Sequence, residues 1–176
     1  MGPTVVDRLH TDFSGLLAVL GTADKVSLRN VADENFRKAL LMAAASYFER
    51  CMTDAVLDFV AEVTTEGHVL TWLIRNKAVS RQYHTWFNWE QKNVNSFFGL
   101  FGKAFQDRMK ALVNSDSDLD SSIQAFLEIG RERNRLVNED YGSFPLEKTS
   151  EEIYGLYRDA TKFVEWFPIA LRQFTE

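Results

Sequence analysis

The stretch that decides the fold is "NFRKALLMAAASYFERCMTDAVLDFVAEVT", residues 35–64. It is rich in alanine, leucine and methionine, which have high helix propensity, and the side chain of Asp33 can cap a helix beginning there. The alanines at 43–45 would let a neighbouring helix approach closely in the middle of this stretch, while aromatic side chains fill the flanks. We therefore expect a long central helix around which the rest of the chain packs.

Helical periodicity continues on both sides of this stretch. A polar connection is expected at 22–31, an aromatic connector at 81–89, and a break at 114–122, where Ser117 or Asp118 can cap the next helix. Gly99 and Gly102 weaken the prediction of an unbroken helix around them. Further helices are predicted at residues 5–21, 66–80, 93–113, 119–139 and 153–174.

The last predicted helix has the clearest start signal. Thr149 to Glu152 read "TSEE", a capping box, whereas Pro168 is expected to kink or split the helix near its end. No alternating strand pattern or internal repeat is present. The sequence therefore predicts an all-α fold, an up-and-down bundle of five or six helices forming a single domain over residues 1–176.

Composition excludes several classes of protein. With 45% hydrophobic residues, 14 Phe and a net charge of -5, the chain is typical of a globular protein without general affinity for nucleic acid, so RNA contact would need a local basic groove. Cys51 is the only cysteine, which excludes an intrachain disulfide and suits the cytoplasm. We found no export signal, no membrane-spanning window, no metal-ligand constellation and no phosphate-binding glycine loop, so we expect no cofactor and no membrane partner.

Residues 131–144 read "RERNRLVNEDYGSF", and polar side chains crowd the last two turns of the predicted helix. Arg131, Asn134 and Asn138 share one side at about 100° per residue, while Arg133 lies closer to the apolar seam, beside Val137. A cation near a buried seam needs a carboxylate, a carbonyl or a phosphate as its partner. Periodicity alone favours a structural role, in which the basic residues complement the helix dipole and Arg133 pairs with an acid on a neighbouring helix.

Three stretches also resemble one known family. "RNRLVN", "EDYGSF" and "TSEEIYGLYRDATKFVEWF" are similar to the C-terminal half of HEPN domains, particularly the RiboL-PSP-HEPN group. The upstream "FRKALLMAAASYFERCMTDAVLDFV" and "RNKAVSRQYHTWFNWEQKNVNSFFGLFG" resemble that group in order and spacing, so the similarity covers roughly residues 33–167. It implies a small helical bundle that commonly dimerises. Many HEPN domains are metal-independent endoribonucleases of toxin-antitoxin, phage-defence and RNA-processing systems.

The resemblance also implies roles for individual residues. The family motif is an arginine followed a few residues later by a histidine; Arg133 matches the arginine and Asn134 the polar residue after it, but Asn138 stands at the histidine position. Asparagine cannot transfer protons as imidazole does. Arg133 could still clamp the scissile phosphate and stabilise its charge, with Asn138 orienting a hydroxyl or water. Glu49, on the earlier long helix, is a candidate for aligning Arg133; its structural alternative is an exposed residue on a polar stripe.

Further basic residues are candidates for holding RNA. Arg131 and Arg135 flank the motif, and Arg81 and His84 lie within the aromatic connector, whose rings could stack on bases. Alternatively, the connector plugs one end of the bundle and its charges are solvated. Two functions stay open: a homodimeric metal-independent endoribonuclease, and a catalytically silent HEPN module that binds RNA, an antitoxin or another protein.

Overall fold

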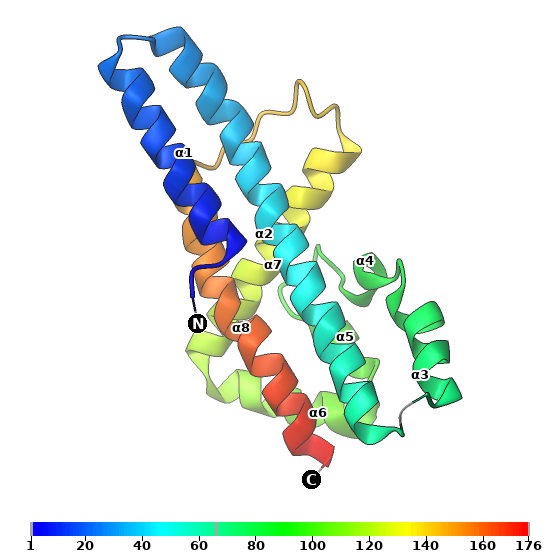
Figure 1. The fold of residues 1–176 in the computed structure, drawn as a ribbon. Helices are drawn as coiled ribbons and strands as arrows, with labels where there is room; N and C mark the ends of the chain where they lie inside the picture. Colours follow the sequence, from blue (N-terminus) through cyan, green and yellow to red (C-terminus); the bar gives the residue numbers. More distant parts are fainter. Residues whose placement is uncertain (1, 66, 176) are drawn as a thin grey trace. The chain divides into compact units, whose positions relative to one another are not determined.

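The computed structural model describes residues 2–65 and 67–175, and within them the chain forms helices and no strand (Figure 1). The predicted all-α class is confirmed. The described residues form eight α-helices and one π-helix rather than five or six helices, because the middle of the chain divides into short pieces. In chain order they are α1 Val5–Thr22, α2 Val26–Val63, α3 Val69–Ile74, the π-helix η1 Arg75–Val79, α4 Tyr83–Trp86, α5 Asn95–Gly99, α6 Lys103–Ser115, α7 Ser117–Asn138 and α8 Ser150–Thr175.

Backbone contacts divide the chain into two compact units. The first unit comprises Met1–Tyr47 and Glu128–Arg158, and the second comprises Phe48–Leu127 and Asp159–Glu176. The boundaries fall inside α2, α7 and α8, so each unit contains a segment of all three helices. The single domain expected from the sequence stays a prediction.

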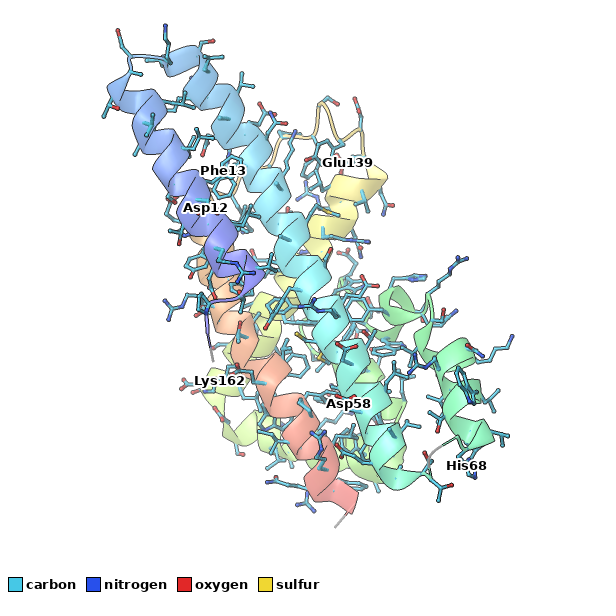
Figure 2. All side chains as sticks on the ribbon, viewed as in Figure 1. Asp12, Phe13, Asp58, His68, Glu139 and Lys162 are labelled. Carbon is cyan, nitrogen blue, oxygen red and sulfur yellow. The ribbon has the colours of Figure 1, made fainter. Side chains whose placement is uncertain are left out.

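In the first unit, α1 pairs with the beginning of α2. The ring of Phe13 stacks on that of Phe36 with centroids 3.9 Å apart, between the two helices (Figure 2). Thr4 caps α1 in a reciprocal capping box with Asp7, whose carboxylate accepts from the Thr4 amide at 2.7 Å. The start of α1 is therefore fixed both by its cap and by aromatic packing.

Asp7 also ties α1 to α8. The Tyr154 hydroxyl donates to its carboxylate at 2.8 Å. Burial raises the pKa of Asp7, but hydrogen bonds from Thr4 and Tyr154 together with the charge of Arg158 outweigh it, so the pKa lies below its usual value of 3.8. Because the folded form prefers the ionised carboxylate, Asp7 stabilises the fold above its unfolded pKa and loses that contribution as pH falls through its folded pKa.

We therefore expect Asp7→Asn to destabilise the protein more at neutral pH than in acid. The difference in unfolding free energy between wild type and variant, measured by urea denaturation, should shrink as pH drops below 3.8. Asp12→Asn, an exposed change on the same helix, is the control. A difference that is constant from neutral pH to acid would contradict a stabilising ionised Asp7.

The core of the second unit is aromatic. Phe126 of α7 contacts the rings of Phe48, Phe87, Trp89 and Phe163, with centroid distances of 5.0–5.9 Å. Tilted and edge-on arrangements of this kind add stabilisation to that of buried area. The ring of Phe126 thus joins α2, the aromatic connector and α8 within this unit.

A buried serine joins α7 to α8 in the second unit. The Ser122 hydroxyl donates to the Asp159 carbonyl at 2.6 Å and accepts from the Phe163 amide at 2.7 Å. These two backbone groups stand four residues apart, the spacing of partners in a regular α-helix. One hydroxyl therefore satisfies a donor and an acceptor of α8 and fixes the register of the two helices in this unit.

Several predicted boundaries need correction. The residues expected to form a polar connection are mostly helical, since α2 begins at Val26 and Asp33 lies inside it. Neither Ser117 nor Asp118 caps α7; the carboxylate of Asp116 accepts from the amides of residues 118 and 119 at 3.0 and 2.9 Å. Pro168 does not split α8, which continues to Thr175.

Other signals are confirmed. Thr149 and Glu152 form the predicted capping box, with the Thr149 amide donating to the Glu152 carboxylate at 2.8 Å and the Glu152 amide donating to the Thr149 hydroxyl at 3.2 Å. The glycines interrupt the helix as expected: α5 ends at Gly99, and Gly102 has a φ of 99°, a conformation that glycine adopts without a steric cost.

Candidate functional site at the end of α7

The candidate residues of the motif occupy the last two turns of α7, within the first unit. Figure 2 labels Glu139, the residue that directly follows this helix. Arg133 and Asn134 are partly exposed and Asn138 is exposed, so solvent and a polymeric ligand have access to this end of the helix. The structure therefore brings together five of the predicted residues, which are Arg131, Arg133, Asn134, Arg135 and Asn138.

Arg133 is held by its neighbour rather than by an acid. Its Nη1 donates to the carboxamide oxygen of Asn134 at 3.1 Å. Among residues 2–65 and 67–175, no carboxylate lies within ion-pair distance of its guanidinium. The structural interpretation, in which Arg133 pairs with an acid of a neighbouring helix, is therefore wrong for the described residues. The guanidinium keeps donors that can bind a phosphate in a bidentate manner.

The apolar seam near the motif differs by one residue from the prediction. Leu136 is fully buried, whereas Val137, expected in the core, is 44% exposed. The register shifts because Ile129 and Leu136 continue the buried face of α7 in this unit, as residues seven apart do on a helix. Arg133 stands four residues after Ile129 and three before Leu136, so it lies on this same face of α7; it is only partly exposed, and its guanidinium needs a polar partner.

Arg135 has partners of its own. Its Nη1 lies 3.2 Å from both carboxylate oxygens of Glu132, and its guanidinium carbon is 5.3 Å from the ring centroid of Phe144. Glu132 therefore neutralises part of its charge, and the aromatic ring restrains its position. Arg131 has no such partner among the described residues, so Arg131 and Arg133 provide most of the positive charge at this end of α7.

The segment after α7, residues 139–149, packs back onto α2 and is called the docked loop below. Lys38 of α2 is only 2% exposed, and its Nζ donates to the Tyr141 carbonyl at 2.9 Å and to Glu34 at 3.1 Å. The same ammonium lies 5.3 Å from the ring centroid of Tyr141. A buried lysine requires such partners, and here they fix the first turn of the docked loop.

Arg37 fixes the other end of the docked loop. Its Nη1 donates to the carbonyl oxygens of Leu146 and Lys148 at 2.8 and 3.3 Å. Its Nε lies 3.2 Å from Asp33, within ion-pair range but without hydrogen-bond alignment. Lys148 in turn pairs with Glu128 of α7 at 2.5 Å. The loop is thereby held to α2 by Arg37 and Lys38, and to α7 by the ion pair of Lys148 with Glu128.

Sequence reasoning missed Arg37 and Lys38. Their partners are carbonyl oxygens more than a hundred positions away along the chain, and a carbonyl leaves no mark in the sequence. The signal that could have drawn attention to Lys38 is its position between Phe36 and Leu40, both fully buried, on a helix whose exposed face offers ample room for a lysine.

Three other predicted residues belong to the second unit. Glu49 of α2 is exposed, and so are Arg81 and His84. Arg81 has a φ of 59°, an uncommon conformation for a residue other than glycine, at the turn between η1 and α4. Their proposed cooperation with the α7 residues stays a prediction.

The aromatic connector is a structural element. Tyr83 and Trp86 are buried, so their rings are not available for stacking on bases, and the Trp86 indole donates to the Ala78 carbonyl at 2.9 Å. The Trp89 indole donates to the His84 carbonyl at 3.1 Å. Of the two interpretations, the geometry favours the structural one, in which the rings of the connector pack and its charges, at Arg81 and His84, are solvated.

The remaining histidines are engaged elsewhere. His68 caps α3, its Nδ1 accepting from the Leu70 amide at 3.1 Å, and Figure 2 shows it at the start of that helix. His10 stacks on Tyr154 with ring centroids 4.0 Å apart. Across the described ranges, no group of three or more His, Cys, Asp and Glu side chains is placed to hold a metal ion. Nor does any described helix have the length and apolar composition needed to cross a membrane.

These features define an all-α protein with a paired arginine and asparagine at the end of a long helix, beside a loop that cations fix in place. Comparison with protein families identifies that class more closely: the RiboL-PSP-HEPN family matches residues 12–173, so the chain belongs to this family. The resemblance seen in the sequence is thus confirmed and extends beyond residues 33–167. No curated protein and no solved structure was found to match the chain.

Proposed function

We propose that the protein is a metal-independent endoribonuclease of a toxin or phage-defence type, acting in the cytoplasm as a homodimer whose α7 ends line a shared RNA cleft. The single observation that carries this proposal is the state of Arg133. Its guanidinium is partly exposed, is oriented by the Asn134 carboxamide and has no carboxylate partner among the described residues. An arginine in this state can bind a phosphate and stabilise the charge that develops during its transfer.

The chemistry of RNA cleavage assigns roles to the neighbouring residues. The 2′-hydroxyl must lose a proton, the phosphorane charge must be balanced and the leaving oxygen must gain a proton. Arg133 balances the charge, and Asn134 holds the guanidinium in its orientation. Asn138 orients the hydroxyl or a water molecule through its amide, which supports positioning but no proton transfer. Arg131 and Arg135 would hold flanking phosphates.

A specific observation also supports a second function, a silent HEPN module that binds RNA, an antitoxin or another protein. Residue 138 is an asparagine, which cannot take up or release a proton near neutral pH. The histidines at 10 and 68 make structural contacts. Without an imidazole at position 138, positioning and charge stabilisation act alone at this end of α7, and the rate falls by the factor that proton transfer normally supplies, about a hundredfold or more.

Cleavage in excess chelator tests the two functions directly. Structured and unstructured RNA would be incubated with wild type and with Asn138→His, and new ends mapped by primer extension. We expect slow cleavage by wild type and an increase of about a hundredfold in Asn138→His, because an imidazole supplies the missing proton transfer. Cleavage by neither protein would contradict the nuclease proposal. Cleavage by the histidine variant alone would show a silent binding module on an intact scaffold.

The proposed homodimer has its own test. Val137 and Tyr141 are 44% and 47% exposed beside the motif, an apolar surface that a second copy could cover. Light scattering at micromolar concentration is expected to give twice the mass of one chain, and Val137→Glu to shift the protein toward monomer. A single-chain mass for wild type, with helix content intact by circular dichroism, would contradict the dimer.

A further inference from the structure

A cavity of about 480 Å³ lies in the second unit, between the later part of α2 and the segment from α3 to α5. Figure 1 shows α3 and the following green segment opposite the C-terminal half of α2. The volume of the cavity falls in the range of small-molecule sites. Its walls come from α2, the junction of α3 with η1 and residues 82–101, and they are apolar except for Lys77, Gln82 and Thr85.

Two helical faces form the apolar walls of this cavity. Val56, Phe59 and Val60 follow the three- and four-residue spacing of one face of α2. Ile74 and Ala78 lie opposite, at the junction of α3 with η1, where the Ser80 amide donates to the Arg75 carbonyl at 2.8 Å, five residues back. Short π-helices occur frequently at functional sites. Here the π-turn belongs to the cavity wall.

The floor of the cavity is rigid and offers no hydrogen bond to a ligand. Phe97 is fully buried and stacks on Trp86 with ring centroids 5.7 Å apart. The Trp86 indole is already bound to the Ala78 carbonyl. Leu100, 61% exposed, lies at the mouth. An apolar group entering the cavity would therefore displace water from carbon surfaces alone.

Two polar residues of the cavity, Lys77 and Gln82, offer donors to an anion. Lys77 is its single charged residue, and neither Asp nor Glu lines it. Within the described ranges, the Lys77 ammonium has no ion-pair partner and the Gln82 side-chain amide has no acceptor. The Thr85 hydroxyl donates to the backbone carbonyl of Gln82 at 2.7 Å. Thr85 can therefore accept a hydrogen bond from a ligand but cannot donate one. An ammonium and an amide therefore remain as donors beside an apolar interior.

We propose that this cavity binds a small amphiphilic carboxylate, with its apolar body against Trp86 and Phe97 and its carboxylate at Lys77 and Gln82. Apolar burial supplies affinity, and the single cation sets the orientation and selects a monoanion over a neutral alcohol of the same length. The site is formed by the second unit alone and requires neither RNA nor Arg133.

Isothermal titration of the full chain with octanoate, and with octanol as the matched neutral ligand, tests this site. Wild type is expected to bind octanoate saturably. Lys77→Met should weaken octanoate about tenfold, the loss of one charge-assisted hydrogen bond, and leave octanol binding unchanged. Lys25→Met, an exposed change in the first unit, is the control and should leave both affinities unchanged.

Filling the cavity provides an independent test. Ala78→Trp should abolish binding of both ligands without changing the melting temperature, because the new ring occupies the space. If that variant does not fold, backbone amide shifts in wild type locate the ligand: shifts confined to the cavity residues support the proposal, and shifts elsewhere overturn it. Failure of octanoate to bind, or equal binding by wild type and Lys77→Met, also overturns it.

Discussion

Arg133→Ala is expected to lower the rate of RNA cleavage by on the order of a thousandfold. The guanidinium is the group at the end of α7 that can balance charge on a pentacoordinate phosphorus, and removing one preorganised donor of this kind costs a hundredfold to a thousandfold in comparable sites. With Asn138 unable to transfer protons, charge stabilisation carries a large share of the acceleration, so the effect should lie at the upper end of that range.

The measurement is single-turnover cleavage of a labelled RNA in excess chelator, together with growth after induced expression. Arg133→Ala should relieve any growth arrest that wild type causes. Arg29→Ala is the matched control, since Arg29 is exposed and lies in the same unit outside the motif. Arg133→Lys tests geometry, because an ammonium keeps the charge and loses the bidentate contact. Equal cleavage rates for wild type and Arg133→Ala would remove Arg133 from the mechanism.

Phe126→Ala is expected to lower the free energy of unfolding by about 3–5 kcal/mol, the cost of replacing a buried phenylalanine by alanine. The ring is 1% exposed and has four aromatic neighbours, from α2, the aromatic connector and α8. Its removal deletes those contacts together and leaves a void that rigid rings cannot readily fill.

Chemical denaturation followed by circular dichroism measures this loss. Leu112→Ala is the control, because Leu112 is 41% exposed on α6 of the same unit. This change should lower the free energy of unfolding by well under about 1 kcal/mol. A loss of less than about 1 kcal/mol for Phe126→Ala would show instead that the aromatic core closes around the space left by the missing ring. Phe126→Leu, which retains most of the volume, should recover part of the stability.

Local signals in the sequence predicted much of the fold. The capping box at Thr149 and Glu152, the interruption at Gly99 and Gly102, and the helical class all depend on neighbouring residues, and all are confirmed. The start of α2 was missed because Val26 to Asn30 contains no apolar stripe; the capping potential of Asp33 then suggested a boundary within a continuing helix.

The candidate site was predictable in its residues and less so in its surroundings. The motif located Arg133, Asn134 and Asn138 on one helix end, and the structure keeps them together. Periodicity misplaced Val137 by one position, since a helix face defined by few apolar residues tolerates a shift of about 100°. The partners of Arg37 and Lys38 could not be predicted, because long-range contacts to carbonyl oxygens follow from tertiary structure.

The way in which α2 holds the docked loop has an evolutionary consequence. Lys38 and Arg37 bind the carbonyl oxygens of residues 141, 146 and 148, and every amino acid carries that oxygen. Substitutions in the loop can therefore change the side chains it presents beside α7 while the attachment to α2 persists. One loop path is therefore compatible with many loop sequences, because the atoms that hold it belong to the backbone.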